Sequence, residues 1–242
     1  MMRVAVVGLV MALAACAAPI HNAELAVLDD NAGYRFHNIN HGARDDTLVV
    51  VTMSGGGTRA AALATGALHG LHAARFADDG TPLDREIDIL SSVSGGSVAA
   101  AYFARHGFEG LDRLEQTFLR QNVISDLVAA GLNPVNLARL PTASYARIDS
   151  LVAAIRKRLF SEGESYQTLL ESGGTHPYLI VNAGDVAAEG VFPFTQERFD
   201  LICSNLVEME LAHAVAASAA FPVALSALTL KNYSPCAAQD QA

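Results

Sequence analysis

Ser94 is the first candidate for chemistry, because it lies in the sequence Ser-Val-Ser-Gly-Gly at residues 92–96, between an apolar run and an alanine-rich run. A sharp turn between a strand and a helix lifts a serine clear of a sheet, and its neighbours must be small because the backbone passes close by. The pattern fits the nucleophile turn G-x-S-x-G, except that Ser92 stands where the first glycine usually is. It indicates a serine that attacks an acyl carbon; an ordinary glycine–serine turn is the alternative.

A second group that could do chemistry is the run of three glycines, Gly55, Gly56 and Gly57. Consecutive glycines let successive backbone N–H groups converge without obstruction by side chains. Such groups can hold an oxyanion, and each donor lost from a well-built hole costs about 3 kcal/mol of transition-state stabilisation. A phosphate-binding loop is not expected, because the G-x-x-x-x-G-K-[ST] pattern is absent. A glycine-rich turn without a ligand is the remaining alternative.

Two strand–turn–helix units position these groups. The β-branched run at 47–53 predicts a buried parallel strand, which leads through the glycines into a helix at 60–76. Residues 86–93 predict the next strand, followed by the serine turn and a helix at 98–107. Later segments continue the alternation: a mainly helical stretch at 108–172, strands at 176–185 and 191–195, and a helix at 211–220. The sequence therefore predicts an α/β fold with a mainly parallel central sheet.

Composition limits the classes of function. The chain has 242 residues, of which 51% are hydrophobic and 17% charged, so it can bury one sizeable core. Its net charge of −9, without a run of lysine or arginine, speaks against a nucleic-acid partner. The eight histidines show no metal-ligand spacing, so a metal site is not expected.

The N-terminus predicts export. Residues 1–15 are apolar after one positive charge and too short to span a bilayer, which is typical of a signal peptide. The run Leu-Ala-Ala before Cys16 resembles the lipobox of bacterial lipoproteins, so we expect a lipid on Cys16; an ordinary signal peptide is the alternative. The residue after Cys16 is Ala17 and not aspartate, which favours the outer membrane as the location of the lipid anchor. We expect a tether and irregular lead-in at 16–46, anchored in the cell envelope on its periplasmic side.

Export would place Cys203 and Cys236 in an oxidising compartment, where a disulfide can persist. Because Cys16 would be acylated, these two thiols alone are left to pair. A disulfide between them is one prediction, and two unrelated thiols are the other.

Together the two motifs are more specific than either alone. GGGxR at 55–59 and SxSGG at 92–96 resemble the patatin-like phospholipase family, in which a glycine-rich oxyanion loop precedes a serine turn on a three-layer α/β/α fold. The resemblance covers about 47–233, within a domain that we place at 47–242. Two departures are Ser54, where an aspartate often precedes the glycines, and Ser92.

The resemblance implies roles for the residues that match the motifs. Ser94 would attack the ester carbonyl of a phospholipid or other lipid and form an acyl-enzyme. The backbone amides of Gly55, Gly56 and Gly57 would supply the oxyanion hole. Arg59 would orient the glycine loop, a surface arginine at a helix start being the alternative. Water, or another alcohol, would accept the acyl group, and apart from water the reaction would need no cofactor.

The resemblance also implies a Ser–Asp dyad, with the aspartate in an Asp-Gly motif on a later strand. The sequence has one Asp-Gly, Asp79–Gly80, which precedes the serine and is a poor candidate. Asp240 is followed by glutamine in a polar tail, and Asp185 ends a strand that is structural in the family. We therefore expect a domain cut short at its C-terminus, before the catalytic aspartate.

Two further functions stay open. In a Ser-His-Asp esterase, His176 or His213 would be the base, since both follow the serine in the chain. In a non-catalytic lipoprotein of the same fold, the chain would bind lipid or a protein partner at the envelope.

Overall fold

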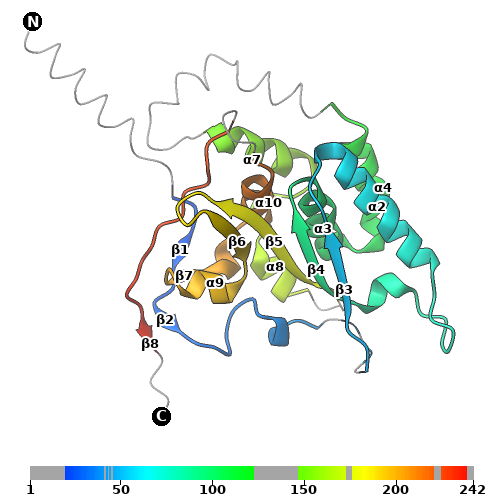
Figure 1. The fold of residues 1–242 in the computed structure, drawn as a ribbon, viewed down its shortest axis with the longest axis horizontal. Coiled ribbons are helices and arrows are strands. Elements are labelled where there is room, and N and C mark those ends of the chain that lie inside the picture. The colour runs from blue at the N-terminus through cyan, green and yellow to red at the C-terminus, as the bar shows by residue number, and fades with distance from the viewer. Residues whose placement is uncertain are drawn as a thin grey trace, which may run out of the picture.

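The computed structural model describes residues 20–40, 42, 44, 46–122, 147–172, 176–220 and 225–238. The predicted signal peptide, Cys16 and Asp240 lie outside the described residues. Four strands form the central sheet in the order β3-β4-β5-β6 (Figure 1). Their bounds are Val49–Met53 for β3, Ile87–Val93 for β4, Tyr178–Asp185 for β5 and Gly190–Phe194 for β6. The first three run parallel and β6 returns antiparallel to β5, which confirms the mainly parallel α/β sheet.

The helices alternate with the strands along the chain: α2 follows β3, α3 follows β4, and α10 comes after the last strand of the sheet. The four longer ones are α2 (Gly57–Ala73), α3 (Gly95–His106), α7 (Arg147–Arg158) and α10 (Leu211–Ala219). The shorter ones are α4 (Leu111–Leu114), α8 (Tyr166–Leu170) and α9 (Gln196–Asp200). Single turns occur at η1 (Phe36–Asn38), η2 (Leu83–Glu86), η3 (Phe108–Gly110), η4 (Glu115–Leu119) and η5 (Leu206–Glu208). Within these described segments, no helix is both long and apolar enough to cross a membrane.

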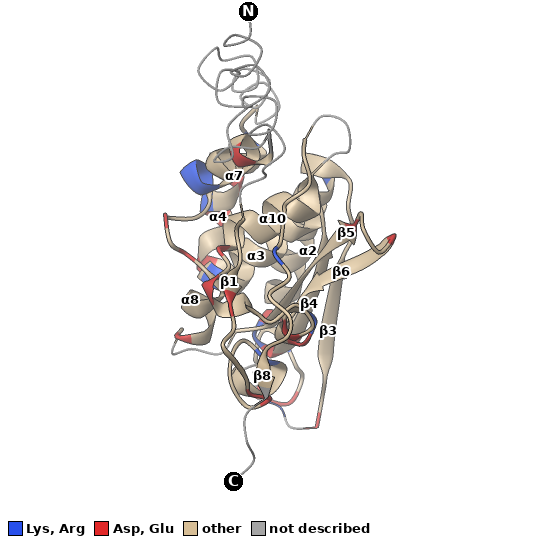
Figure 2. Ribbon diagram, turned by 90° about the vertical axis from the view of Figure 1, so that its left-hand side faces the viewer, with Lys and Arg blue, Asp and Glu red and all other residues tan. Residues whose placement is uncertain are grey.

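The longer helices gather on one face of the sheet (Figure 2). α3 and α10 pack directly on β4 and β5, while α2 packs along α3 and α7 along α10. The alanines of α3 allow this close approach, and its residues Gly95–Ala104 are all buried. On the opposite face Val50 remains 48% exposed, and no α-helix of the described segments covers it. The described residues therefore form two layers of the expected three-layer architecture.

The lead-in is packed on the domain instead of forming a free tether. β1 (Ala23–Glu24) pairs with β7 (Ser204–Asn205), and β2 (Val27–Leu28) pairs with β8 (Ala237–Ala238). Tyr34 is fully buried, with its ring 5.0 Å from that of Tyr178 in β5. Its aromatic surface accounts for the ordering of a segment whose polar composition predicts a tether.

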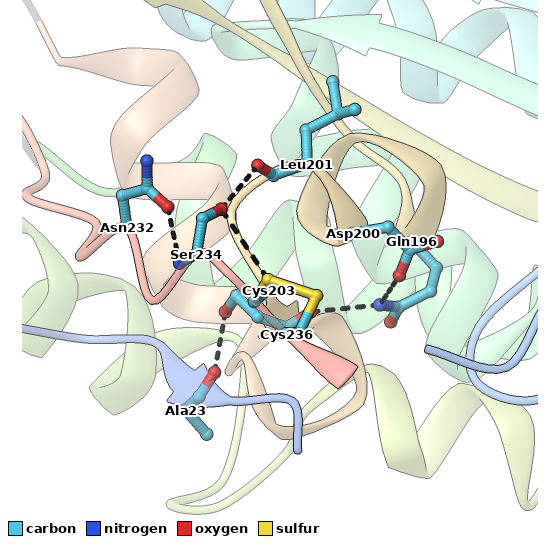
Figure 3. The surroundings of a disulfide bond; sticks show 9 residues. Ala23, Gln196, Asp200, Leu201, Cys203, Asn232, Ser234 and Cys236 are labelled. Atoms are coloured by element: carbon cyan, nitrogen blue, oxygen red, sulfur yellow. Dashed lines mark hydrogen bonds between the residues drawn. A yellow bond between two sulfur atoms is a disulfide. The ribbon is translucent and has the colours of Figure 1, made fainter. Parts of the chain in front are cut away.

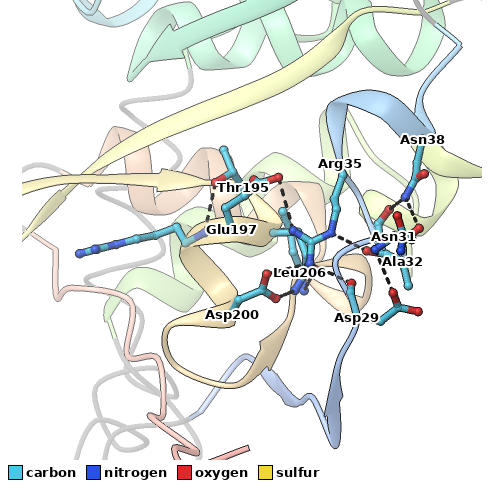
Figure 4. A network of polar contacts seen from close by, with 12 residues as sticks. Asp29, Asn31, Ala32, Arg35, Asn38, Thr195, Glu197, Asp200 and Leu206 are labelled. Atoms are coloured by element: carbon cyan, nitrogen blue, oxygen red, sulfur yellow. Dashed lines mark hydrogen bonds and ion pairs between the residues drawn. The ribbon is translucent and has the colours of Figure 1, made fainter. Parts of the chain in front are cut away.

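Arg35 fastens the lead-in to α9 (Figure 4). Its side chain is only 4% exposed, and its Nη2 lies 2.7 Å from Asp200 Oδ2. Nη1 lies 3.4 Å from Glu197 Oε1, and Nε donates a hydrogen bond to the carbonyl of Ala32. A buried guanidinium needs such partners, because an unpaired buried charge is costly.

The structure joins Cys203 and Cys236 in a disulfide, with their Cα atoms 5.5 Å apart (Figure 3). The bond holds the C-terminal segment against the corner between α9 and β7. Beside it, the Ser234 hydroxyl donates to the carbonyl of Leu201. The loop closed by the disulfide contains the whole of α10, so both ends of the segment that carries this helix are covalently linked.

Candidate active site

Ser94 stands at the sharp turn between β4 and α3, as the motif predicts. Its backbone angles are φ 52° and ψ −120°, and its side chain is half-buried. Positive φ is rare for a residue with a Cβ, and such strain costs about 1–3 kcal/mol. Strained residues of this kind occur where the surrounding structure holds a side chain for function. The turn thus places the Ser94 hydroxyl at the carboxyl end of the parallel strands.

The glycines after Ser94 allow the turn to touch the glycine loop. A Cβ on Gly95 would lie 2.0 Å from the carbonyl oxygen of Gly57. A Cβ on Gly96 would lie 2.7 Å from the carbonyl oxygens of both Met53 and Ser54. Only glycine fits at either position, because real Cβ contacts are much longer. The two motifs that stand almost forty residues apart in the sequence are therefore in direct backbone contact.

The glycine loop lies beside the Ser94 side chain. A Cβ on Gly55 would be 3.3 Å from Ser94 Cβ. Gly56 and Gly57 have φ values of +143° and +64°, which a side chain would disfavour. Within the described part of the chain, the amides of these three glycines donate no hydrogen bond. The three residues are exposed at the N-terminus of α2, where helix amides have no partner within the helix. They are free to donate to an oxygen bound next to Ser94.

Ser218, near the C-terminal end of α10, is a site residue that sequence reasoning did not identify. Its Oγ accepts a hydrogen bond of 2.7 Å from the backbone amide of Ser94 and donates one of 2.6 Å to the carbonyl of Asn182. It also lies 3.0 Å from Ser97 Oγ. Ser218 therefore links the nucleophile turn to the end of β5.

We predict that Ser218→Ala weakens the fold by about 1–3 kcal/mol, because the amide of Ser94 loses its acceptor. The turn should also become less well positioned, so reaction at Ser94 should slow. Denaturant unfolding and the rate of covalent labelling of Ser94 measure the two effects.

Ser226→Ala is the matched control, because Ser226 accepts a similar hydrogen bond from the amide of Ile148. It should lower stability to a similar extent and leave the labelling rate unchanged. Equal labelling rates in both variants would contradict the positioning role of Ser218.

Ser92 fits the turn despite the departure from the glycine pattern. Its side chain is 1% exposed and donates a hydrogen bond of 3.3 Å to the carbonyl of Ile180 in β5. The hydroxyl is thus directed to the neighbouring strand, where it does not obstruct the turn.

No carboxylate or imidazole of the described segments makes a hydrogen bond to the Ser94 hydroxyl. Asp185 accepts hydrogen bonds from the amides of Ala187 and Ala188 and pairs with Arg198 across 3.3 Å. These bonds, the one from Ala188 first, lower the pKa of Asp185, so it closes the β5–β6 turn as an ionised group. Asp79 pairs with Arg44 near the far end of α2, about 25 Å along that helix from the glycine loop.

The histidines considered as bases also lie elsewhere. His213 points into a cluster with His21, and burial lowers its pKa to about 4. His176 lines a cavity of about 300 Å³ that Ser94 does not line. It precedes β5, at the opposite end of the strand from Asn182. The described residues thus give no support to a Ser-His-Asp arrangement.

Arg59 is exposed in the first turn of α2. Within the described segments it makes no hydrogen bond or ion pair with the glycine loop. Its loop-orienting role stays a prediction.

Comparisons with known proteins agree with the family that the motifs resemble. Residues 51–234 match the family model described as "Patatin-like phospholipase". No curated protein matches the chain.

Two of the solved structures that are similar to parts of this chain are phospholipase A2 and ExoU structures. A human GIVD cytosolic phospholipase A2 in complex with methyl gamma-linolenyl fluorophosphonate is 18% identical, covering 62% of this chain and 23% of that one, with a TM-score of 0.42. Full-length ExoU of Pseudomonas aeruginosa, bound to SpcU, is 17% identical, covering 73% of this chain and 39% of that one, with a TM-score of 0.37. This chain thus spans less than two fifths of either protein.

Proposed function

Because the chain belongs to the patatin-like phospholipase family, we propose that it hydrolyses ester bonds of phospholipids or other lipid esters with Ser94 as the nucleophile. One observation carries the proposal: Ser94 has a strained backbone in direct contact with the glycine loop. Strained backbone of this kind is frequent at active sites, which supports the role proposed for Ser94.

The chemistry assigned to these residues is acyl transfer in two steps. Ser94 Oγ attacks the ester carbonyl carbon, and its proton passes to a base. The carbonyl oxygen becomes an oxyanion, which the amides of Gly55, Gly56 and Gly57 stabilise by hydrogen bonds. Collapse of this intermediate breaks the C–O bond, and the alcohol leaves with a proton. Water then attacks the acyl-enzyme and releases a fatty acid.

The base is the part of the mechanism that the described residues do not supply. In the family it is the aspartate of an Asp-Gly motif, and no described carboxylate occupies that place beside Ser94. This observation favours a second candidate function, a non-catalytic protein of the same fold that binds lipid or an envelope partner. Both functions use the exposed site at the glycine loop, and they differ in whether a covalent bond forms at Ser94.

A fluorophosphonate that carries a fatty chain separates the two. We expect the purified full chain to be phosphonylated at Ser94, as identified by peptide mass spectrometry, and to release fatty acid from phospholipid vesicles. Ser94→Ala should show neither reaction. Ser172→Ala, which removes a serine at the end of α8, should show both. A folded protein that binds the vesicles, is not phosphonylated at Ser94 and releases no fatty acid would instead establish the lipid-binding function.

For the N-terminus we propose a diacylglycerol on Cys16, which would hold the protein at the periplasmic side of a bacterial cell envelope. The support is the lipobox-like sequence before Cys16. The described residues begin at Ile20, so a lipid on Cys16 would lie only a few residues from the folded lead-in.

A further inference from the structure

Three side chains of metal-binding type meet at a point distinct from Ser94. They are His21 in the lead-in, Asp149 in α7 and His213 in α10, and their ligand atoms all lie within 4.8 Å of one another. His21 Nε2 is 3.5 Å from Asp149 Oδ1, and the two imidazole rings are 4.5 Å apart at their centroids. Ligands around a tetrahedral zinc ion are about 3.4 Å apart, as follows from bonds of about 2.0–2.2 Å. The three ligand atoms would therefore move closer together on binding an ion.

Burial distinguishes this cluster from a chance meeting of surface groups. The side chains of His21, Asp149 and His213 are only 13%, 19% and 11% exposed. His21 Nε2 is inaccessible to solvent and has no hydrogen-bond partner in the described part of the protein. Buried polar atoms are almost always satisfied, so this nitrogen calls for a partner. A metal ion between the three side chains would supply one.

The charges nearby also suit a cation. Glu210 Oε2 lies 3.7 Å from His213 Nδ1, where a second carboxylate can orient a ligating imidazole. The positive charge of Arg156 would repel a metal ion, but this guanidinium is paired with Glu210, with its Nε 2.6 Å from Glu210 Oε2. Among the side chains that the structure describes here, the carboxylates of Asp149 and Glu210 therefore face one guanidinium, that of Arg156.

We propose that His21, Asp149 and His213 together bind one zinc ion. Two imidazoles and one carboxylate are a ligand set that zinc favours, and the fourth position would be filled by water or by Glu210. The three ligands come from three separate segments, so the ion would fasten the lead-in to α7 and α10. His213 lies about 7–8 Å along α10 from Ser218, so the ion would also hold the helix that positions Ser94.

The test is a cobalt(II) titration of the purified, oxidised full chain, prepared without a polyhistidine tag and freed of metal by a chelator. We expect one equivalent of cobalt to give the visible bands of a four-coordinate site without a thiolate band, and zinc to displace it. Zinc should also raise the melting temperature. His21→Gln and His213→Gln should each weaken binding by at least about 100-fold, since even loss of a group that only orients a ligand costs up to about that much.

His37→Gln is the matched control, since His37 is exposed and outside the cluster, and it should bind like the parent chain. His213→Gln alters a buried position of α10, so we expect it to destabilise the protein. His21→Gln alters only the lead-in and is therefore the variant on which the test depends. Absence of saturable one-to-one binding in the parent chain would overturn the site. Unchanged affinity in a folded His21→Gln protein would overturn it equally.

Discussion

Replacing Ser94 by glycine should raise the melting temperature of the protein by about 2–4 °C while abolishing ester hydrolysis. Glycine adopts the observed φ of 52° without strain, which returns about 1–3 kcal/mol to the folded state. Glycine also makes the unfolded chain more flexible, which costs about 0.4–1 kcal/mol, so the net gain is about 1 kcal/mol. Loss of the nucleophile should lower turnover by roughly 10⁴-fold or more. Thermal unfolding and fatty-acid release measure the two changes.

Ser94→Ala separates the strain from the chemistry. Alanine keeps the Cβ and hence the strained backbone, so this variant should be as inactive as Ser94→Gly without its gain in stability. If the two variants melt at the same temperature, the strain at this turn is not real. Turnover that survives in both would rule out Ser94 as the nucleophile.

Gly95→Ala should have the largest effect on the fold of any single methyl group in the site. The added Cβ would meet the carbonyl oxygen of Gly57 at 2.0 Å, and neither atom can rotate away, because the backbone fixes both positions. We expect a loss of stability of about 3 kcal/mol and displacement of the glycine loop. Labelling of Ser94 should fall with it, because the amides of the glycine loop, which we propose as oxyanion donors, would move. Denaturant unfolding and the labelling rate test both statements.

Gly66→Ala is the control for this change, because a Cβ there has nothing within 4 Å in the middle of α2. The same substitution should then stabilise the protein by about 0.5–1 kcal/mol, since alanine favours a helix. Opposite signs at the two positions would show that contact, not helix propensity, sets the cost at Gly95. A Gly95→Ala protein as stable as the parent would contradict the packing of the two motifs.

The sequence allowed the strands, the serine turn and the glycine loop to be predicted because each is local. The runs at 47–53 and 86–93 identify strands β3 and β4, and small residues mark the turns that follow them. That the glycine run meets the serine turn follows from parallel topology, since the carboxyl ends of neighbouring strands share one edge. The family match confirms the family that the motifs resemble, and the roles of Ser94 and the glycines stay predictions from that resemblance.

The rest depends on contacts between distant parts of the chain. Ser218 is an ordinary serine in an alanine-rich helix until α10 is placed against the turn, 124 residues away from Ser94 in sequence. His21, Asp149 and His213 have no common motif, so their meeting could not be found from spacing. The packing of the lead-in on the domain depends on Tyr34 and Arg35. The partners of Tyr34 come more than 100 residues later in the chain, and those of Arg35 come from its own turn and from α9.

The contact between Gly57 and Gly95 has an electrostatic consequence, because each residue begins a helix, α2 in one case and α3 in the other. The N-terminus of a helix acts as roughly half a positive charge, so the two together amount to about one. A protein of net charge −9 therefore carries, at its serine, a small positive pole to which the peptide dipoles of two helices contribute. Unlike a lysine or a histidine, that pole has no proton to lose, so it attracts an oxyanion at every pH at which the fold survives.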